Sequence, residues 1–157
     1  MLKTNLSSDI HIQPLSGSIG ASVTGVRLVE LDAEQFAVLH EAFLKYYMLV
    51  FPRQDLAVED VAAFAAWWGE TVTTSFLKYL DGHHGISKLF NRGKADTVTE
   101  NWHSDTPFLP KPPAINILSA IHVPIGGDTM WSNQYLAYER LSPGMQEMMA
   151  ELKIEYN

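Results

Sequence analysis

The feature that most restricts the fold of this chain is the order of its segments, some with the hydrophobic pattern of strands and others with that of helices. Residues 11–28 mix β-branched side chains with glycine and serine, which predicts short strands joined by turns. Residues 32–47 then carry large apolar side chains every three to four positions, the pattern of an amphipathic helix. Asp32 is placed to cap this helix, and Gln35 can complete a capping box.

The later segments also alternate between the hydrophobic pattern of strands and that of helices. The stretch "MLVFP" (48–52) predicts a buried strand, and "VEDVAAFAAWWGE" (58–70) predicts a second helix that ends near its glycine. The apolar stretch "AINILSAIHV" (Ala114–Val123) predicts a longer strand. This strand is expected to end at the turn residues that follow it, which are Pro124, Gly126 and Gly127.

The remaining segments are predicted from residues that favour turns and from residues that cap helices. The stretches "DGHHG" (81–85) and "NRGKAD" (91–96) predict turns or loops, while "ISKLF" (86–90) and "DTMWS" (128–132) are candidate strands. Residues 141–153 predict a helix with Ser142 at its N-cap and Pro143 at its first position. We expect one stripe of this helix to pack in the core: Met145, Met148, Met149 and Leu152.

The resulting order is strands, two helices, further strands and a helix. A doubly wound parallel sheet requires a regular alternation of strand and helix, which this order lacks. The pattern therefore predicts an α+β fold, in which a β-rich core has helices packed on one side.

Composition narrows the function classes. The chain has 157 residues, about the size of one domain, and a net charge of −7, which argues against nucleic-acid and anionic-membrane partners. It has no cysteine, which excludes disulfides, thiolate metal sites and cysteine nucleophiles. The N-terminus shows no signal-peptide pattern, and the longest apolar run, Val61–Trp68, is too short to span a bilayer. We expect a cytoplasmic protein.

The segment "TENWHSDTPF" (Thr99–Phe108) carries the candidate chemistry. If its backbone is extended, His103 and Asp105 lie on the same face and present an imidazole and a carboxylate to one point. These are two of the three ligands in a 2-His-1-carboxylate site for non-haem Fe(II). About 0.3 His-x-Asp patterns are expected by chance in such a chain, so the motif alone is weak. We expect Trp102 to pack behind this pair.

The wider context makes the motif specific. The ensemble "NWHSDTPF…PPAINILSAIHVPIGGDTMWSN", together with "PLSGSIGASVTGVRL", "MLVFPRQDL" and "WWGE" earlier in the chain, resembles the taurine dioxygenase (TauD/TfdA) family of Fe(II)- and 2-oxoglutarate-dependent dioxygenases. The likeness covers nearly the whole chain and keeps the family's order of segments.

The resemblance implies a double-stranded β-helix (jelly-roll) core, of which residues 1–157 would form the N-terminal portion of a single domain. It implies that His103 and Asp105 are iron ligands and that the Thr129 hydroxyl contacts 2-oxoglutarate. The cofactors would be Fe(II), 2-oxoglutarate as co-substrate and O2. The family couples decarboxylation of 2-oxoglutarate to succinate with hydroxylation of an unactivated C–H bond.

The chain departs from the family in two ways. The family's third iron ligand, a histidine, and the arginine that binds 2-oxoglutarate both match positions beyond Asn157. We therefore expect an incomplete jelly roll, no turnover by this chain alone, and poor folding or self-association, with a homo-oligomer as one outcome.

The second departure concerns the substrate. Val72 and Thr99 stand near the positions where taurine-specific members carry polar side chains, which disfavours taurine itself. A sulfonate, a sulfate, an aryloxyalkanoate or a natural-product intermediate remains open as the organic-acid substrate. The candidate pocket residues are Val72, Thr99, Thr106 and Phe108.

Two other functions stay open. A binding or assembly module could have the same fold and a degenerate metal site. A zinc hydrolase could use His103 and Asp105 with one further histidine, taken from His83, His84 and His122.

Overall fold

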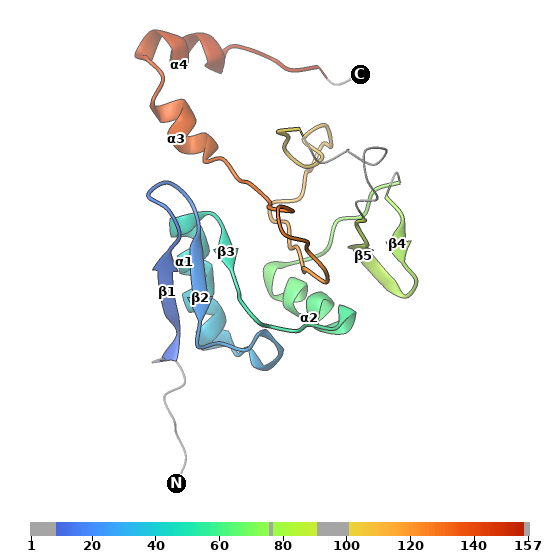
Figure 1. Cartoon of the computed structure of the whole chain (residues 1–157). Coiled ribbons are helices and arrows are strands. Elements are labelled where there is room, and N and C mark those ends of the chain that lie inside the picture. The colour runs from blue at the N-terminus through green and yellow to red at the C-terminus, as the bar shows by residue number, and fades with distance from the viewer. Residues whose placement is uncertain (1–8, 76, 91–100, 156–157) are drawn as a thin grey trace. The chain divides into compact units, whose positions relative to one another are not determined.

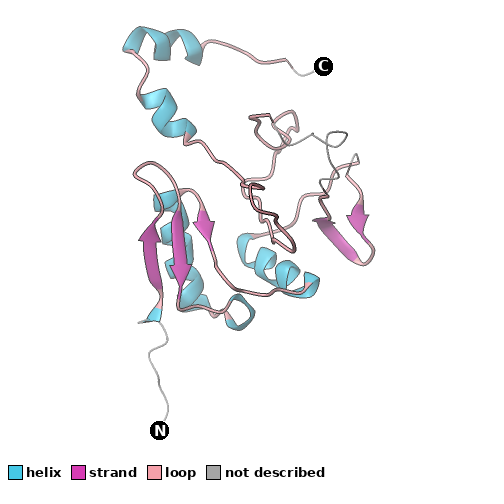
Figure 2. Cartoon of the chain, in the orientation of Figure 1, coloured by secondary structure: helices cyan, strands magenta, loops and turns pink. Residues whose placement is uncertain are grey.

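The structure is a computed structural model that describes residues 9–75, 77–90 and 101–155 (Figures 1 and 2). Contacts between Cα atoms divide the chain into two compact units. The first unit comprises residues 1–55 and 121–157, and the second comprises residues 56–120. Each unit is described by itself below.

A small mixed sheet forms the base of the first unit. Strand β1 (His11–Pro14) pairs antiparallel with β2 (Ala21–Thr24), and β2 pairs parallel with β3 (Leu49–Val50). The connection from β1 to β2 is a turn, whereas a helix, α1 (Ala33–Tyr46), separates β2 from β3. The predicted strands at 11–28 and 48–52 are therefore confirmed, but the expectation that the second strand is buried is wrong, because Val50 is 38% exposed.

Both ends of α1 are set by its own residues. Asp32 Oδ1 accepts from Gln35 N at 2.8 Å, and Gln35 Oε1 accepts from Asp32 N at 3.3 Å, which is the predicted capping box. The helix ends at Tyr47, whose N–H still donates to the Phe43 carbonyl oxygen at 2.7 Å and whose left-handed φ of 63° then turns the chain out of the helix.

The core of the first unit lies between this helix and the sheet, and Figure 1 shows α1 along one sheet face. The buried apolar side chains come from both layers and from the connection between them: Ala21, Val23, Val26, Leu28, Leu39 and Ala42. The 3-10 turn η2 (Leu28–Glu30) is held by Gln54, whose Oε1 accepts from Leu28 N at 3.0 Å and whose Nε2 donates to the Val26 carbonyl oxygen at 3.1 Å.

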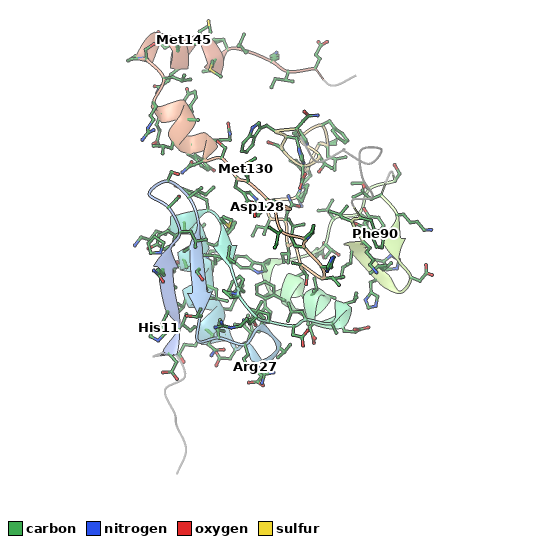
Figure 3. The ribbon with its side chains drawn as sticks, in the orientation of Figure 1. His11, Arg27, Phe90, Asp128, Met130 and Met145 are labelled. Atoms are coloured by element: carbon green, nitrogen blue, oxygen red, sulfur yellow. The ribbon has the colours of Figure 1, made fainter. Side chains whose placement is uncertain are left out.

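Two short helices, α3 (Gln134–Glu139) and α4 (Pro143–Ala150), also belong to the first unit. Ser142 caps α4 as predicted, because its Oγ accepts from Met145 N at 3.4 Å. The prediction that the methionine stripe packs in the core is wrong. Met145, which Figure 3 labels, is exposed, and no residue of α4 is buried. An amphipathic pattern marks a face that can be buried, but a layer against that face is needed to bury it.

The second unit contains α2 (Val58–Trp68) and a two-stranded antiparallel sheet of β4 (Tyr79–Leu80) and β5 (His83–Ser87). Helix α2 begins where Asp60 Oδ2 accepts from Ala57 N at 2.9 Å, and it ends before Gly69, whose φ of 127° suits glycine. The prediction of a loop at 81–85 is wrong in its second half, because β5 begins at His83. The stretch 91–96 lies outside the described residues.

The predictions of strands at Ala114–Val123 and 128–132 are also wrong, because the structure has no strand between residues 101 and 155. A strand exists only where a neighbouring backbone accepts its hydrogen bonds, and the apolar pattern does not supply that neighbour. The predicted turn after Val123 is confirmed: Gly127 N donates to the Pro124 carbonyl oxygen at 3.0 Å, and Gly126 has a φ of 85°.

The coarse prediction of a mixed sheet-and-helix fold is confirmed. No helix in the described ranges is long and apolar enough to cross a bilayer.

Candidate metal centre

The structure brings His103 and Asp105 together. His103 Nε2 lies 3.1 Å from Asp105 Oδ1, and the two side chains are 47% and 51% exposed. The segment around them, Trp102–Ser104, has no regular secondary structure, so the convergence does not depend on a strand. Trp102 is 68% exposed, which corrects the expectation that it packs behind the pair. The two side chains thus face one point at an accessible part of the second unit.

The backbone fixes the tautomer of His103. Its Nδ1 lies 2.7 Å from the Asn101 carbonyl oxygen, and a carbonyl oxygen only accepts, so Nδ1 carries a proton. In the neutral imidazole, Nε2 then presents its lone pair toward the Asp105 carboxylate. Two such acceptor atoms at 3.1 Å need a proton or a cation between them. Residue-type patterns could not reveal the role of Asn101, because the group that acts is its backbone carbonyl.

A tight turn follows directly on Asp105. The Thr106 carbonyl oxygen accepts from Leu109 N at 3.1 Å, and Pro107 occupies the second position of the turn, where its fixed φ is favoured. Thr106 itself has a left-handed φ of 47°. Phe108 is half exposed. The turn thus redirects the chain immediately after the carboxylate.

The pair fits a divalent metal ion. Two donors bound about 2.1 Å from one ion at the right angle of an octahedral site lie about 3.0 Å apart. The observed separation of 3.1 Å matches this value, and it also lies within the range of an ordinary N–H···O hydrogen bond. One imidazole and one carboxylate are the donor types that non-haem Fe(II) takes, and the hydrogen bond at Nδ1 is the support that a metal-binding histidine usually has.

A third protein ligand is not found within the part of the chain that the structure describes. No three histidine, aspartate or glutamate side chains in that part are grouped to hold a metal. His83 Nε2 instead lies 3.5 Å from Glu59 Oε1, and His84 is exposed on β5. His122 belongs to the other unit. The histidines named for a zinc site are therefore not shown to join the pair.

The remaining predicted site residues fall in both units or outside the described residues. Thr129 is exposed and belongs to the first unit, whereas His103 and Asp105 belong to the second. Val72 is exposed just after α2. Thr99 lies outside the described residues. The contact of Thr129 with 2-oxoglutarate and the pocket roles of Val72 and Thr99 stay predictions.

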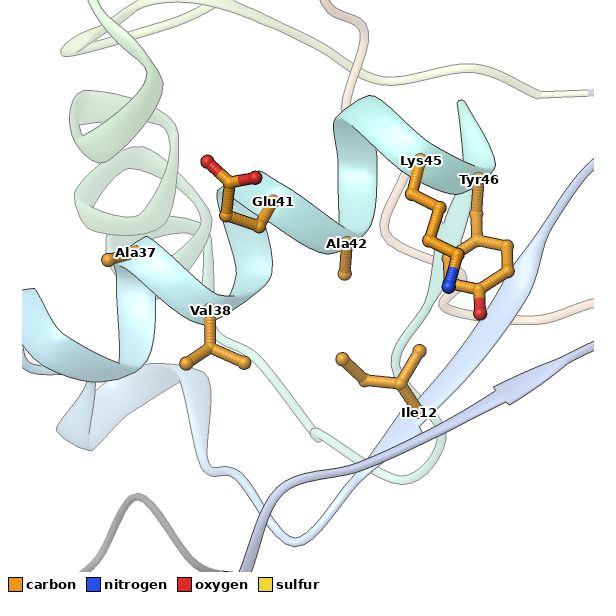
Figure 4. A pocket seen from close by; sticks show the side chains of 7 residues that line it. All are labelled: Ile12, Ala37, Val38, Glu41, Ala42, Lys45 and Tyr46. Atoms are coloured by element: carbon orange, nitrogen blue, oxygen red, sulfur yellow. The ribbon is translucent and has the colours of Figure 1, made fainter.

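A separate groove in the first unit is unrelated to these residues (Figure 4). It has a volume of about 640 Å³ and lies where α1 meets β1. Most of its lining is apolar and comes from one helix face: Ile12, Ala37, Val38, Glu41, Ala42, Lys45 and Tyr46. None of the predicted site residues lines it.

Comparison with known proteins assigns the lineage. The family model for the taurine catabolism dioxygenase TauD, TfdA family matches residues 11–157. This chain belongs to the TauD/TfdA family. The TauD/TfdA family consists of 2-oxoglutarate-dependent non-haem iron dioxygenases, so the lineage inferred from the His-x-Asp context is confirmed.

Individual proteins are similar to this chain over nearly its whole length. An alkylsulfatase from Acinetobacter baylyi is 33% identical over 94% of this chain and 46% of its own length. An (S)-phenoxypropionate/alpha-ketoglutarate-dioxygenase from Delftia acidovorans is 30% identical over 92% of this chain and 53% of its own length. The crystal structure of a taurine dioxygenase from Burkholderia xenovorans matches 91% of this chain and 51% of its own, with 29% identity and a TM-score of 0.73. The chain thus spans about half the length of the relatives it matches.

Proposed function

We propose that His103 and Asp105 are two of the three protein ligands of an Fe(II) centre in a 2-oxoglutarate-dependent dioxygenase that hydroxylates a small organic acid. The 3.1 Å separation between His103 Nε2 and Asp105 Oδ1 carries this proposal, because it matches two adjacent ligands of one ion. Residues 1–157 would be the N-terminal portion of one jelly-roll domain. Family membership over residues 11–157 supports this reading.

The residues present would hold and orient the reactants. His103 would coordinate through Nε2, since Nδ1 is engaged by the Asn101 carbonyl oxygen. Asp105 would coordinate through Oδ1. Bound Fe(II) and 2-oxoglutarate would supply the oxidising chemistry, in which O2 is consumed and succinate and CO2 are released. Thr129 would donate its hydroxyl hydrogen to the co-substrate.

The substrate would be an organic acid with an apolar part. Proteins similar to this chain are named for alkyl sulfates and for phenoxypropionate. Val72 and Thr99 stand near the positions where taurine-specific members carry other polar side chains, so we propose an alkyl sulfate or aryloxyalkanoate in preference to taurine. Phe108, three residues beyond Asp105 and half exposed, would contact the apolar part.

Binding of Mn(II), a redox-stable substitute for Fe(II), tests the centre. Free Mn(II) is measured by electron paramagnetic resonance during titration of the wild-type chain and of His103→Ala, Asp105→Ala and the control His84→Ala. We expect wild type and the control to bind equally, and the two ligand variants to lose binding. Equal binding by all four proteins would overturn the proposal, and loss in His84→Ala would favour a zinc-type site that includes β5.

Turnover tests the second half of the proposal. The 157-residue chain with Fe(II), ascorbate and 2-oxoglutarate is expected to form no succinate, since two protein ligands hold the ion weakly. A longer polypeptide with a downstream histidine and arginine is expected to form it. Succinate from the 157-residue chain would contradict the claim that the site is incomplete. Failure of both proteins to bind Mn(II) would favour a non-catalytic binding or assembly module.

A further inference from the structure

Thr106 combines two locally unfavourable features, and the first is its backbone. Its φ of 47° places a β-branched residue in the left-handed region, where branched side chains clash with the backbone. It also precedes Pro107, which disfavours helical conformations of the residue before it. Glycine or asparagine would adopt this conformation with less strain. Three other non-glycine residues in the described ranges have positive φ, and none of them is β-branched: Tyr47, Arg53 and Asp55.

The second feature is the side chain. Thr106 Oγ1 is buried and has no hydrogen-bond partner within the described residues. A buried hydroxyl without a partner destabilises the fold relative to a valine of the same shape. Strained backbone and unpaired buried polar groups persist mainly where function requires them. A residue that carries both features and adjoins Asp105 is therefore a candidate for a role at the metal centre.

The neighbouring carboxylate supplies an acceptor for this hydroxyl. Asp105 directs Oδ1 toward His103 Nε2, which leaves Oδ2 as an acceptor when one oxygen binds a metal. Carboxylates that bind metals are themselves usually hydrogen-bonded, which fixes their orientation. Because Oγ1 is covered by protein atoms, a diffusing ligand cannot reach it. A rotation about χ1 of Thr106 changes the direction of the hydroxyl without moving the chain.

We propose that Thr106 is a positioning residue, whose hydroxyl donates to Asp105 Oδ2 when a divalent metal ion binds to His103 and Asp105. Thr106 directly follows Asp105 in the chain, so its hydroxyl is attached one residue from that carboxylate. The hydroxyl remains unpaired without metal and gains its partner with metal. This inference rests on the proposed function, because it requires a metal ion at the pair.

Two substitutions separate the hydroxyl from the shape of the side chain. Thr106→Val keeps the branched shape and removes the hydroxyl, while Thr106→Ser keeps the hydroxyl and removes the methyl group. Thr24→Val, at the exposed end of β2, is a matched control. Mn(II) affinity is measured by electron paramagnetic resonance, and thermal unfolding is followed without metal.

We expect Thr106→Val to bind Mn(II) about 10–100-fold more weakly than wild type, the loss typical of removing a group that supports a metal ligand. The Mn(II) affinities of Thr106→Ser and Thr24→Val should stay within about threefold of wild type, since both proteins keep a hydroxyl group at position 106. Without metal, Thr106→Val should unfold at the same temperature as wild type or higher, since it removes an unpaired buried hydroxyl.

The outcomes distinguish this inference from the proposed function. If wild type and Thr106→Val bind Mn(II) equally, the positioning role is refuted and the metal centre stands. Equal weakening in Thr106→Val and Thr106→Ser would attribute the effect to side-chain volume and refute the role of the hydroxyl. A lower unfolding temperature of metal-free Thr106→Val would show a structural role instead. If neither the wild-type chain nor the longer polypeptide binds Mn(II), the proposed function fails, and this inference fails with it.

Discussion

We expect this chain to associate through three exposed apolar side chains at and just beyond the end of the expected strand Ala114–Val123. Ile121, Val123 and Ile125 are 81%, 57% and 107% exposed. Burying a fully exposed aliphatic side chain contributes about 1.5–3 kcal/mol, so these three contribute about 4–7 kcal/mol from one copy and about twice that in a symmetric pair. Association costs about 4–15 kcal/mol in lost freedom of motion, so we expect weak, micromolar-to-millimolar self-association.

A double substitution tests this expectation. Ile121→Lys with Ile125→Lys removes about three-quarters of the exposed apolar contribution and adds charges that resist burial. Sedimentation velocity of wild type at about 10–300 μM should show a sedimentation coefficient that rises with concentration, the range expected for weak association. The double variant should stay monomeric over that range.

A matched change elsewhere controls for general effects of charge. Leu44→Lys replaces an exposed leucine of α1 and should leave the association unchanged. A wild-type chain that remains monomeric at the highest concentration would refute the reasoning, because the exposed side chains would then provide no net association. Equal weakening by Leu44→Lys would show that net charge, and not this segment, controls the behaviour.

Two further predictions concern the stability of the first unit, and chemical denaturation checks both. Asp32→Ala removes the acceptor for Gln35 N and should lower the free energy of unfolding by about 0.5–2 kcal/mol, whereas no change would show that the capping box contributes nothing. Gln54→Leu leaves Leu28 N and the Val26 carbonyl oxygen without their partner and should cost about 1–3 kcal/mol for each group that water cannot reach. A stabilised Gln54→Leu variant would contradict that account.

The features that could be predicted from the sequence depend on residues close together in the chain. The capping box of α1 and the cap of α4 each use side chains that lie three residues from the backbone groups they bind. The turn at Pro124–Gly127 depends on one glycine with positive φ. The approach of His103 to Asp105 belongs to the same class, because two intervening peptide bonds set it.

Features that need a distant neighbour were decided by tertiary structure. The apolar residues of Ala114–Val123 predict a strand, but a strand forms only beside another backbone, and the structure provides none there. The methionines of α4 stay exposed because no layer covers them, whereas Leu39 of α1 is buried because the sheet lies against it. The strain at Thr106 also appears only in the folded chain, since a threonine carries no local signal for a left-handed backbone. Local hydrogen bonds are thus determined by the sequence near them, while burial and strand pairing require a partner surface that only the fold supplies.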